Sequence, residues 1–367
     1  MAITDVIVPV LRHGSLRELR PDLNSTSDGC TASWTAWETT AYVTVTDPAM
    51  LPAARQLVVR QFAAAEKAAA RFRSDAELHK LYRAGGRTIT VSPMLADLIA
   101  AALMAAERTD GDVDPTVGAA MTAVHSGRRA GSRDRSGLPT CGSRPTWGRP
   151  APGWQQVDLR GRRLQVPPGT TLDLSATAKA VACDRAVAEV QAKLGIGVLV
   201  GLGGNVATAG PAPDGGWPVT IHHRTGVGQS KVFLPAGAAL ATSHFRAHLH
   251  GDDAAAEELG SLGHLIDPHT GREPAAVWQT ASAIGFNCLE AAMYAAAALV
   301  RGPSARAWLA RLWIPARLVT VSDDVITVGP WNLHIGNETR RDGNDAADSA
   351  NPSFPTPRVA NPRRTIF

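Results

Sequence analysis

The sequence is poor in cysteine and has little net charge of either sign. It holds 4 Cys in 367 residues, with no C-x-x-C pair and no metal-like spacing, which favours a reduced, cytoplasmic chain. Its formal net charge is +4, from 37 Lys and Arg against 33 Asp and Glu. A balance this close to neutral gives no argument for nucleic acid as the partner.

Long hydrophobic runs are also missing. No apolar stretch approaches the ~20 residues of a membrane span, because Glu, Lys and Arg interrupt the Ala-rich windows. Residues 1–24 lack the continuous apolar segment of a secretory signal. With 44% hydrophobic and 19% charged residues, the chain can nevertheless bury a substantial core, so we expect most of it to be globular, with no membrane span.

Composition divides the chain into an ordered centre and two polar ends. Residues 1–33 are predicted to be a loosely ordered arm, and residues 34–334 the ordered part. Residues 335–367 are rich in Asn, Asp, Arg, Ser and Pro and cannot bury enough apolar surface, so they are predicted to be a disordered tail. Within the centre, the Arg-, Gly- and Pro-rich stretch 126–153 predicts an exposed loop with solvated charges.

Four helices are expected from propensity and punctuation. They cover 49–72, 93–108, 178–194 and 287–300. Ser92 and Pro93 form a typical helix start, and Gly195 a typical helix end. Strands are expected at 42–46, 198–200, 217–222, 231–234, 239–242, 277–284, 317–321 and 325–328, with a hairpin across 159–163.

The stretch Asp173-Leu-Ser-Ala-Thr-Ala-Lys179 is the clearest candidate for a binding site. A strand-like start over 170–174 leads through small residues into the helix at 178. Small residues at such a junction leave backbone N–H groups and a helix N-terminus free to face an anion, and Lys179 adds a positive charge. The same Asp and Lys also fit a purely structural ion pair, which is the commoner situation.

Four motifs follow one another in a characteristic order. They are Gly111-Asp-Val-Asp-Pro-Thr-Val-Gly118, Leu172-Asp-Leu-Ser-Ala-Thr-Ala-Lys179 with Asp184, Gly203-Gly-Asn205, and His264-Leu-Ile-Asp-Pro-His-Thr-Gly271. Over residues 34–332 this sequence resembles the ApbE family, the FAD:protein FMN transferases. The resemblance implies an α+β fold, a single ApbE-like, T-fold-related domain with mixed or antiparallel sheets and flanking helices. It also implies Mg²⁺-dependent transfer of FMN from FAD to a Thr or Ser hydroxyl of an acceptor flavoprotein, with release of AMP.

The resemblance also assigns residues. His264 matches the family's His, and imidazole is suited to act as the base toward the acceptor hydroxyl. The positions that match FAD contacts are Trp37, Asp112, Val113, Asp114, Asp173, Lys179 and Ile266, although Trp37 fits a plain core tryptophan equally well. The positions that match Mg²⁺ ligands are Ala176, through its carbonyl, Glu290 and Tyr294. Asp267 is expected to shape the turn that follows it.

Several positions depart from the family pattern. Glu290 and Tyr294 stand where the family has Asp and Thr, and a neutral phenol is a bulky, poor substitute for a Thr hydroxyl. Further departures are Glu38 for Gly, Tyr82 for Asn, Ala180 for Gly, Asn205 for Asp, and the sequence Ala241-Thr-Ser-His-Phe245. Two alternatives therefore stay open: a degenerate member that binds FAD without transferring it, and an FAD pyrophosphatase in which water replaces the hydroxyl.

Overall fold

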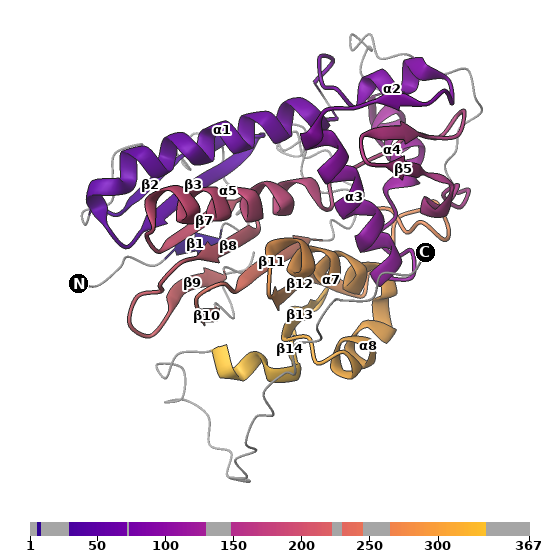
Figure 1. The fold of residues 1–367 in the computed structure, drawn as a ribbon. Coiled ribbons are helices and arrows are strands. Elements are labelled where there is room, and N and C mark those ends of the chain that lie inside the picture. The colour runs from indigo at the N-terminus through magenta and orange to yellow at the C-terminus, as the bar shows by residue number, and fades with distance from the viewer. Residues whose placement is uncertain are drawn as a thin grey trace, which may run out of the picture. The chain divides into compact units, whose positions relative to one another are not determined.

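An antiparallel sheet forms the centre of the fold. The computed structural model describes residues 6–8, 29–71, 73–129, 148–221, 230–244 and 265–334, and Figure 1 follows the chain through them. Within these ranges the large sheet has eight strands in the order β14-β13-β12-β11-β8-β7-β3-β2. In chain order they are β2 (Thr31–Ala36), β3 (Thr39–Val45), β7 (Val198–Leu202), β8 (Asn205–Ala209), β11 (Ala239–His244), β12 (Trp278–Gly285), β13 (Ala316–Thr320) and β14 (Val325–Val328).

Two small sheets accompany the large one. In the first, β1 (Val6–Val8) runs parallel to β9 (Trp217–Ile221), and β10 (Ser230–Leu234) pairs antiparallel with β9. In the second, β6 (Arg163–Gln165) lies between β4 (Ile89–Thr90) and β5 (Asp158–Arg160). The fold is thus α+β with mixed and antiparallel sheets, as the sequence predicts.

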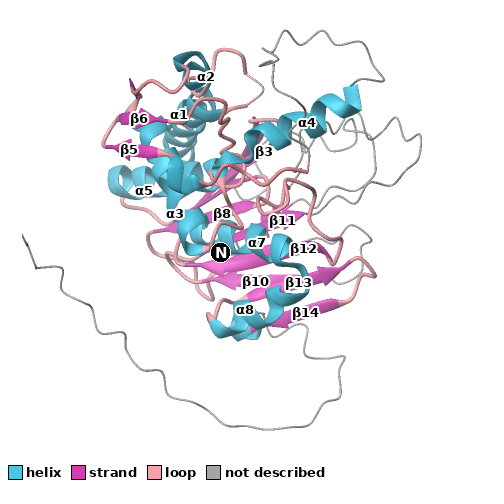
Figure 2. Cartoon of the chain, turned by 90° about the vertical axis from the view of Figure 1, so that its right-hand side faces the viewer, coloured by secondary structure: helices cyan, strands magenta, loops and turns pink. Residues whose placement is uncertain are grey.

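Helices cover one face of the large sheet. The α-helices of the described residues are α1 (Leu51–Ala69), α2 (His79–Ala84), α3 (Pro93–Arg108), α4 (Gly118–Arg129), α5 (Ala178–Leu194), α7 (Cys288–Arg301) and α8 (Ala305–Arg311). Short 3-10 turns occupy Pro48–Met50, Pro115–Val117, Trp154–Gln156, Gly302–Ser304 and Gly329–His334. Figures 1 and 2 show α1, α5 and α7 on the same side of the strands.

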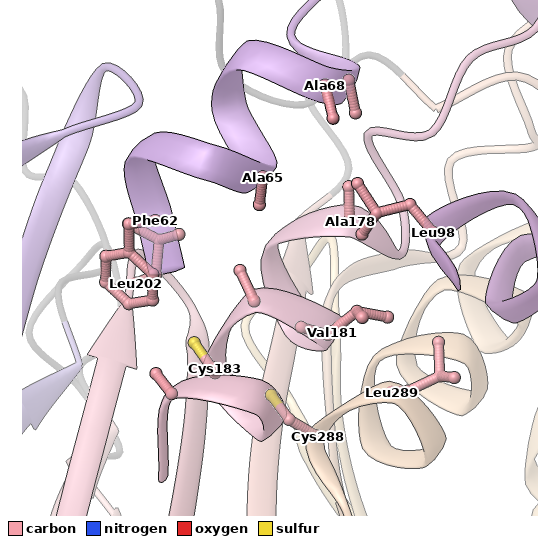
Figure 3. Close-up of a cluster of buried hydrophobic side chains, with 14 of the residues drawn as sticks. Phe62, Ala65, Ala68, Leu98, Ala178, Val181, Cys183, Leu202, Cys288 and Leu289 are labelled. Carbon is pink, nitrogen blue, oxygen red and sulfur yellow. The ribbon is translucent and has the colours of Figure 1, made fainter. Parts of the chain in front are cut away.

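Alternating side chains bury both faces of the sheet. On β7, Val198 and Val200 point into the core beneath α1 and α5, whereas Leu199 points to the opposite side. The close-up in Figure 3 shows the helix side, where Phe62 of α1 lies beside Leu202 and where Cys183 and Cys288 come from α5 and α7. Since a strand that is buried on both faces is continuously apolar, the sequence Val-Leu-Val fits this place.

Most of the expected elements are confirmed. Helix α3 covers 93–108 as predicted, and the Ser92 hydroxyl accepts a hydrogen bond from the N–H of Leu95 at 3.1 Å. Helix α5 ends at Gly195, which has a φ of 66°. The hairpin across 159–163 is formed by β5 and β6. Local capping and turn signals determined these boundaries, because they act within a few residues of sequence.

Other expectations were wrong. Residues 170–174 form no strand, because the carbonyl of Thr171 and the N–H of Asp173 bond to the Pro115–Gly118 turn instead of a β-ladder. Helix α4 extends to Arg129, four residues into the stretch predicted to be a loop. Two strands, β1 and the start of β2, fall inside the predicted N-terminal arm. Elements α2, α8 and β8 were not anticipated.

Some predictions cannot be compared with structure. The predicted tail at 335–367 lies outside the described residues, as does most of the Arg-rich stretch, 130–147. Among the helices that the structure describes, none is long and apolar enough to cross a membrane.

Candidate functional site

Two loops brought together at the start of α5 form the floor of a pocket. The N–H of Asp173 donates to the carbonyl of Pro115 at 2.7 Å, and the N–H of Gly118 donates to the carbonyl of Thr171 at 3.0 Å. A Cβ on Gly118 would lie 2.5 Å from that same carbonyl oxygen. Only glycine therefore permits this close approach, which joins the 111–118 motif to the 172–179 motif.

The pocket collects three of the four sequence motifs. Of the predicted site residues, Asp112, Val113, Asp114, Asp173, Ala176 and Ile266 line it. Trp37, Lys179, Glu290 and Tyr294 are not among its lining residues, and His264 lies outside the described part of the chain. The structure thus gathers most of the predicted flavin contacts in one place.

The Asp173 carboxylate is buried and fully engaged. One oxygen lies 2.7 Å from the guanidinium of Arg71, and the other accepts the N–H of Ser175 at 2.8 Å. The Ser175 hydroxyl donates to that second oxygen as well. Asp173 therefore holds the small-residue turn in shape before α5. Arg71 was not anticipated, because nothing in the sequence around it marks a partner 102 residues away.

Asp114 has a similar shaping role. Its Oδ1 accepts the N–H and the hydroxyl of Thr116, each at 2.7 Å, and its Oδ2 accepts the N–H of Trp154 at 3.0 Å. The carboxylate therefore caps the Pro115–Val117 turn, and its bond to Trp154 holds the segment around that residue against the pocket wall.

Asp112 lies between a histidine and an arginine. The His269 Nε2 is 3.3 Å from one carboxylate oxygen, and the Arg301 Nε donates to the other. Burial raises the pKa of Asp112, and the charges of Arg301 and His269 act against that rise. Arg301 also lies 4.2 Å from the centroid of the Trp308 ring. Neither partner was predicted, although His269 stands inside the histidine motif.

The histidine motif forms a tight turn built on Asp267. Its side chain accepts the N–H of His269 and the hydroxyl of Thr270, both at 2.9 Å, which confirms the predicted shaping role. Gly271 has a φ of 65°, and a Cβ there would lie 1.8 Å from the carbonyl oxygen of Arg149. The glycine thus lets the 148–151 segment pack directly on the turn.

Trp37 lies close to Lys179, which is in the first turn of α5. Trp37 and Glu38 are the two turn residues between β2 and β3, and the Lys179 Nζ lies 6.0 Å from the centroid of the Trp37 indole. Burial lowers the pKa of Lys179, and the charge of Glu38 partly offsets this. A cation over the face of an indole is attracted to it. These residues therefore place a partly buried cation in the first turn of α5.

The binding of Mg²⁺ by Ala176, Glu290 and Tyr294 stays a prediction, and the two side chains among them already have contacts within the protein. The Glu290 Oε2 accepts the N–H of Phe286 at 3.0 Å, and its Oε1 lies 3.8 Å from the Arg108 guanidinium. Tyr294 is 8% exposed and packs edge-on against Trp308, with ring centroids 5.6 Å apart. Among the described residues, no three Asp, Glu, His or Cys side chains converge as a metal site. Hard cations need several oxygen ligands, and the predicted set contains one carboxylate, one phenol and one backbone carbonyl.

The fold is α+β, and its candidate site is a pocket where a helix N-terminus meets two loops. A family model described as the ApbE family matches residues 35–339. The chain therefore belongs to the ApbE family. A comparison with curated proteins gave no match.

Solved structures of ApbE proteins share the fold. The ApbE protein of Thermotoga maritima has a TM-score of 0.67 and 20% identity, covering 83% of this chain and 99% of its own. The apo flavinyl transferase ApbE of Pseudomonas stutzeri has a TM-score of 0.65, 20% identity and coverages of 83% and 97%. The flavin transferase ApbE of Vibrio cholerae has values of 0.63, 19%, 83% and 98%. At this identity the likeness concerns the fold.

Proposed function

We propose that this protein is a flavin transferase, which moves FMN from FAD onto a Thr or Ser hydroxyl of an acceptor flavoprotein and releases AMP. The observation that carries the proposal is the pocket itself. Three motifs separated by tens of residues, at 111–118, 172–179 and 264–271, contribute neighbouring walls to it. Membership of the ApbE family, whose solved members include proteins named flavin transferases, supports the same activity.

The start of α5 is the place we assign to the FAD diphosphate. Thr177 precedes the 17-residue helix and provides no side-chain cap, and the N–H of Ala178 donates to the Leu174 carbonyl at 2.8 Å. The N–H groups of Lys179 and Ala180 therefore lack a side-chain cap and are the ones we assign to the phosphates. Ser175, Ala176 and Thr177 line the pocket directly before this helix start. A helix N-terminus attracts phosphate groups, and Lys179 reinforces the attraction with its charge.

The transfer is a displacement at phosphorus. The acceptor hydroxyl oxygen attacks the phosphorus of the FMN half, the bond from that phosphorus to the oxygen shared with the AMP phosphate breaks, and AMP leaves with the bonding electrons. His264 is proposed to take the hydroxyl proton. It lies outside the described residues, and its support is its place directly before Leu265 and Ile266, which both line the pocket.

The remaining residues position these groups. Asp173 and Asp114 fix the two loops, and Asp112, through Arg301, connects the pocket wall to the end of α7. No step is assigned to a divalent cation, because one Glu290 oxygen already accepts a backbone N–H and Tyr294 packs against Trp308.

Mass spectrometry of an acceptor protein tests the proposal. With FAD and a candidate flavoprotein, we expect the acceptor to gain the mass of one FMN less one water, and only when its acceptor Thr or Ser is intact. His264→Ala should abolish the adduct while calorimetry still detects FAD binding. An acceptor that lacks the hydroxyl is the control. Absence of an adduct under conditions where FAD binds would refute the transfer step.

A second candidate is an FAD-binding protein without transferase activity. Glu290, which accepts a backbone N–H, and the buried Tyr294 favour it, because both residue types depart from the family pattern. Bound FAD that never yields an adduct would support this alternative. Release of free FMN and AMP without any acceptor would instead identify a pyrophosphatase.

A further inference from the structure

A side-chain contact joins two walls of the pocket. The His269 Nε2 lies 3.3 Å from the Asp112 Oδ1, and the two residues are 157 positions apart in the chain. Asp112 belongs to the 111–118 motif and lines the pocket, whereas His269 belongs to the histidine motif, whose Leu265 and Ile266 line it. The pair therefore bridges the two motifs beside the pocket.

Asp112 is the fixed side of this contact. Its side chain is 7% exposed, and the Arg301 Nε donates to its other oxygen, Oδ2. The Arg301 Nη2 in turn donates to the carbonyl of Thr109 at 3.0 Å and to the Asp110 Oδ2 at 3.2 Å. The end of α7 thus holds the turn that carries Asp112, and the carboxylate presents its Oδ1 to His269.

The backbone around His269 is held independently of the imidazole. The N–H of His269 donates to the Asp267 Oδ1 at 2.9 Å. The carbonyl of Pro268 accepts the N–H of Ala151 at 2.7 Å. Neither bond uses the imidazole, so both can remain when the side chain is replaced. A substitution at residue 269 therefore tests the side chain rather than the turn.

The imidazole packs on the opposite wall and donates to it. A Cβ added to Gly111 would lie 3.7 Å from the His269 Cε1, so the ring lies directly against the backbone of the 111–118 motif. Because an ionised carboxylate only accepts hydrogen bonds, we assign the proton to Nε2. One neutral tautomer and the imidazolium both carry that proton, so either form of the ring can donate to Asp112.

We propose that His269 is a positioning residue for FAD binding: through Asp112 it holds the histidine-motif wall and the 111–118 wall at the spacing that FAD needs. The inference rests on the proposed function for its ligand, and it concerns a residue that the resemblance does not assign. Walls that are fixed before binding need not be ordered by the ligand, which improves affinity. Since 56% of the His269 side chain is exposed, its contribution to folding stability should be small.

Calorimetry with FAD tests the inference. In His269→Leu the walls lose their connection, and a fall of the binding-competent arrangement to about one tenth of the molecules weakens the apparent affinity about tenfold. His269→Gln should restore most of the affinity, because its amide nitrogen is a donor with nearly the same reach. The Tm of both variants without FAD should stay close to that of the wild type.

A double-mutant cycle tests whether His269 acts through Asp112. In the Asp112→Ala background, His269→Leu should lower FAD affinity by less than about twofold, because its partner is already missing. Arg301 keeps its bonds to Thr109 and Asp110 in that background. The full tenfold loss there would overturn the inference, since His269 would then act by another route.

Gln61→Leu is a matched control. The Gln61 Nε2 on α1 donates to the Glu189 Oε2 on α5 at 2.6 Å, a contact between residues 128 positions apart, and neither residue lines the pocket. We expect this variant to bind FAD with unchanged affinity. A loss equal to that of His269→Leu would overturn the inference, because it would mark a general effect of removing a long-range hydrogen bond.

The remaining outcomes separate the inference from the proposed function. Wild-type FAD affinity in His269→Leu would overturn the inference and leave the transferase proposal standing. Equal losses in His269→Leu and His269→Gln would also overturn it, because Gln keeps the donor. A large fall in the Tm of His269→Leu without FAD would assign the residue to folding and overturn the inference too. No binding of FAD by the wild-type protein would overturn both proposals.

Discussion

Asp184 connects the two helices that flank the candidate site. It lies on α5, and its carboxylate accepts the N–H groups of Cys288 at 2.7 Å and Leu289 at 3.0 Å, which open α7. Burial raises the pKa of Asp184 to about 6, although the two hydrogen bonds act in the opposite direction. The sequence showed Asp184 as part of a motif, but only the structure shows that it caps a helix 104 residues further along the chain.

This carboxylate should make stability depend on pH. Its folded pKa of about 6 exceeds the unfolded value of about 3.9, so the folded state binds more protons between these values. The free energy of unfolding should therefore fall by up to about 3 kcal/mol as pH rises from 4 to 7, which is two pKa units at ~1.36 kcal/mol each. Urea unfolding of the wild type and of Asp184→Asn measures the difference. The same pH dependence in both proteins would contradict the assignment.

The turn of the β2–β3 hairpin holds two residues with side chains in a left-handed backbone conformation. Ala36 pairs with Thr39, so Trp37 and Glu38 form a two-residue turn, with φ of 49° and 58°. Left-handed values at both positions define the tight turn that favours Asn-Gly, because a Cβ is disfavoured there. The sequence departs from the family's Gly at residue 38, and the structure shows the conformational cost of that departure.

Glu38→Gly should relieve this strain. We expect the free energy of unfolding to rise by about 1 kcal/mol, measured by urea denaturation. Glu38→Ala is the control, since it removes the same charge but keeps the Cβ, and it should give no comparable gain. If Glu38→Ala stabilises the protein as much as Glu38→Gly, the gain comes from removing the charge of Glu38, and the prediction of backbone strain is wrong.

Elements with strong local signals were predicted well, and those made by distant partners were not. Ser92 and Pro93 defined the start of α3 because capping acts within one helical turn. Residues 170–174 looked like a strand, yet their hydrogen bonds go to the Pro115–Gly118 turn. A local sequence pattern does not show a partner more than fifty residues away. Residues 170–174 therefore form a loop beside the pocket, although their sequence resembles a strand.

At the scale of the whole molecule, ligand binding should be coupled to folding. The pocket walls come from the 111–118 turn, the start of α5 and the histidine motif, which meet only in the folded state. FAD at about 100 times its Kd should therefore stabilise the protein by about 2.7 kcal/mol and raise the Tm by several degrees. Riboflavin, which lacks the diphosphate, should stabilise it much less at the same concentration. Calorimetric binding of FAD without a change in Tm would contradict a site formed by tertiary structure.

The sequence by itself determined the α+β class, the family, the motifs and the residue types available to the site. It did so because helix punctuation, hydrophobic alternation and short motifs are local properties of the chain. Tertiary structure alone decided which charges meet: Arg71 with Asp173, Arg301 with Asp112, and Arg108 with Glu290. These pairs join residues roughly a hundred or more positions apart, and their partners are chosen by how helices pack on the sheet rather than by anything written beside them in the sequence.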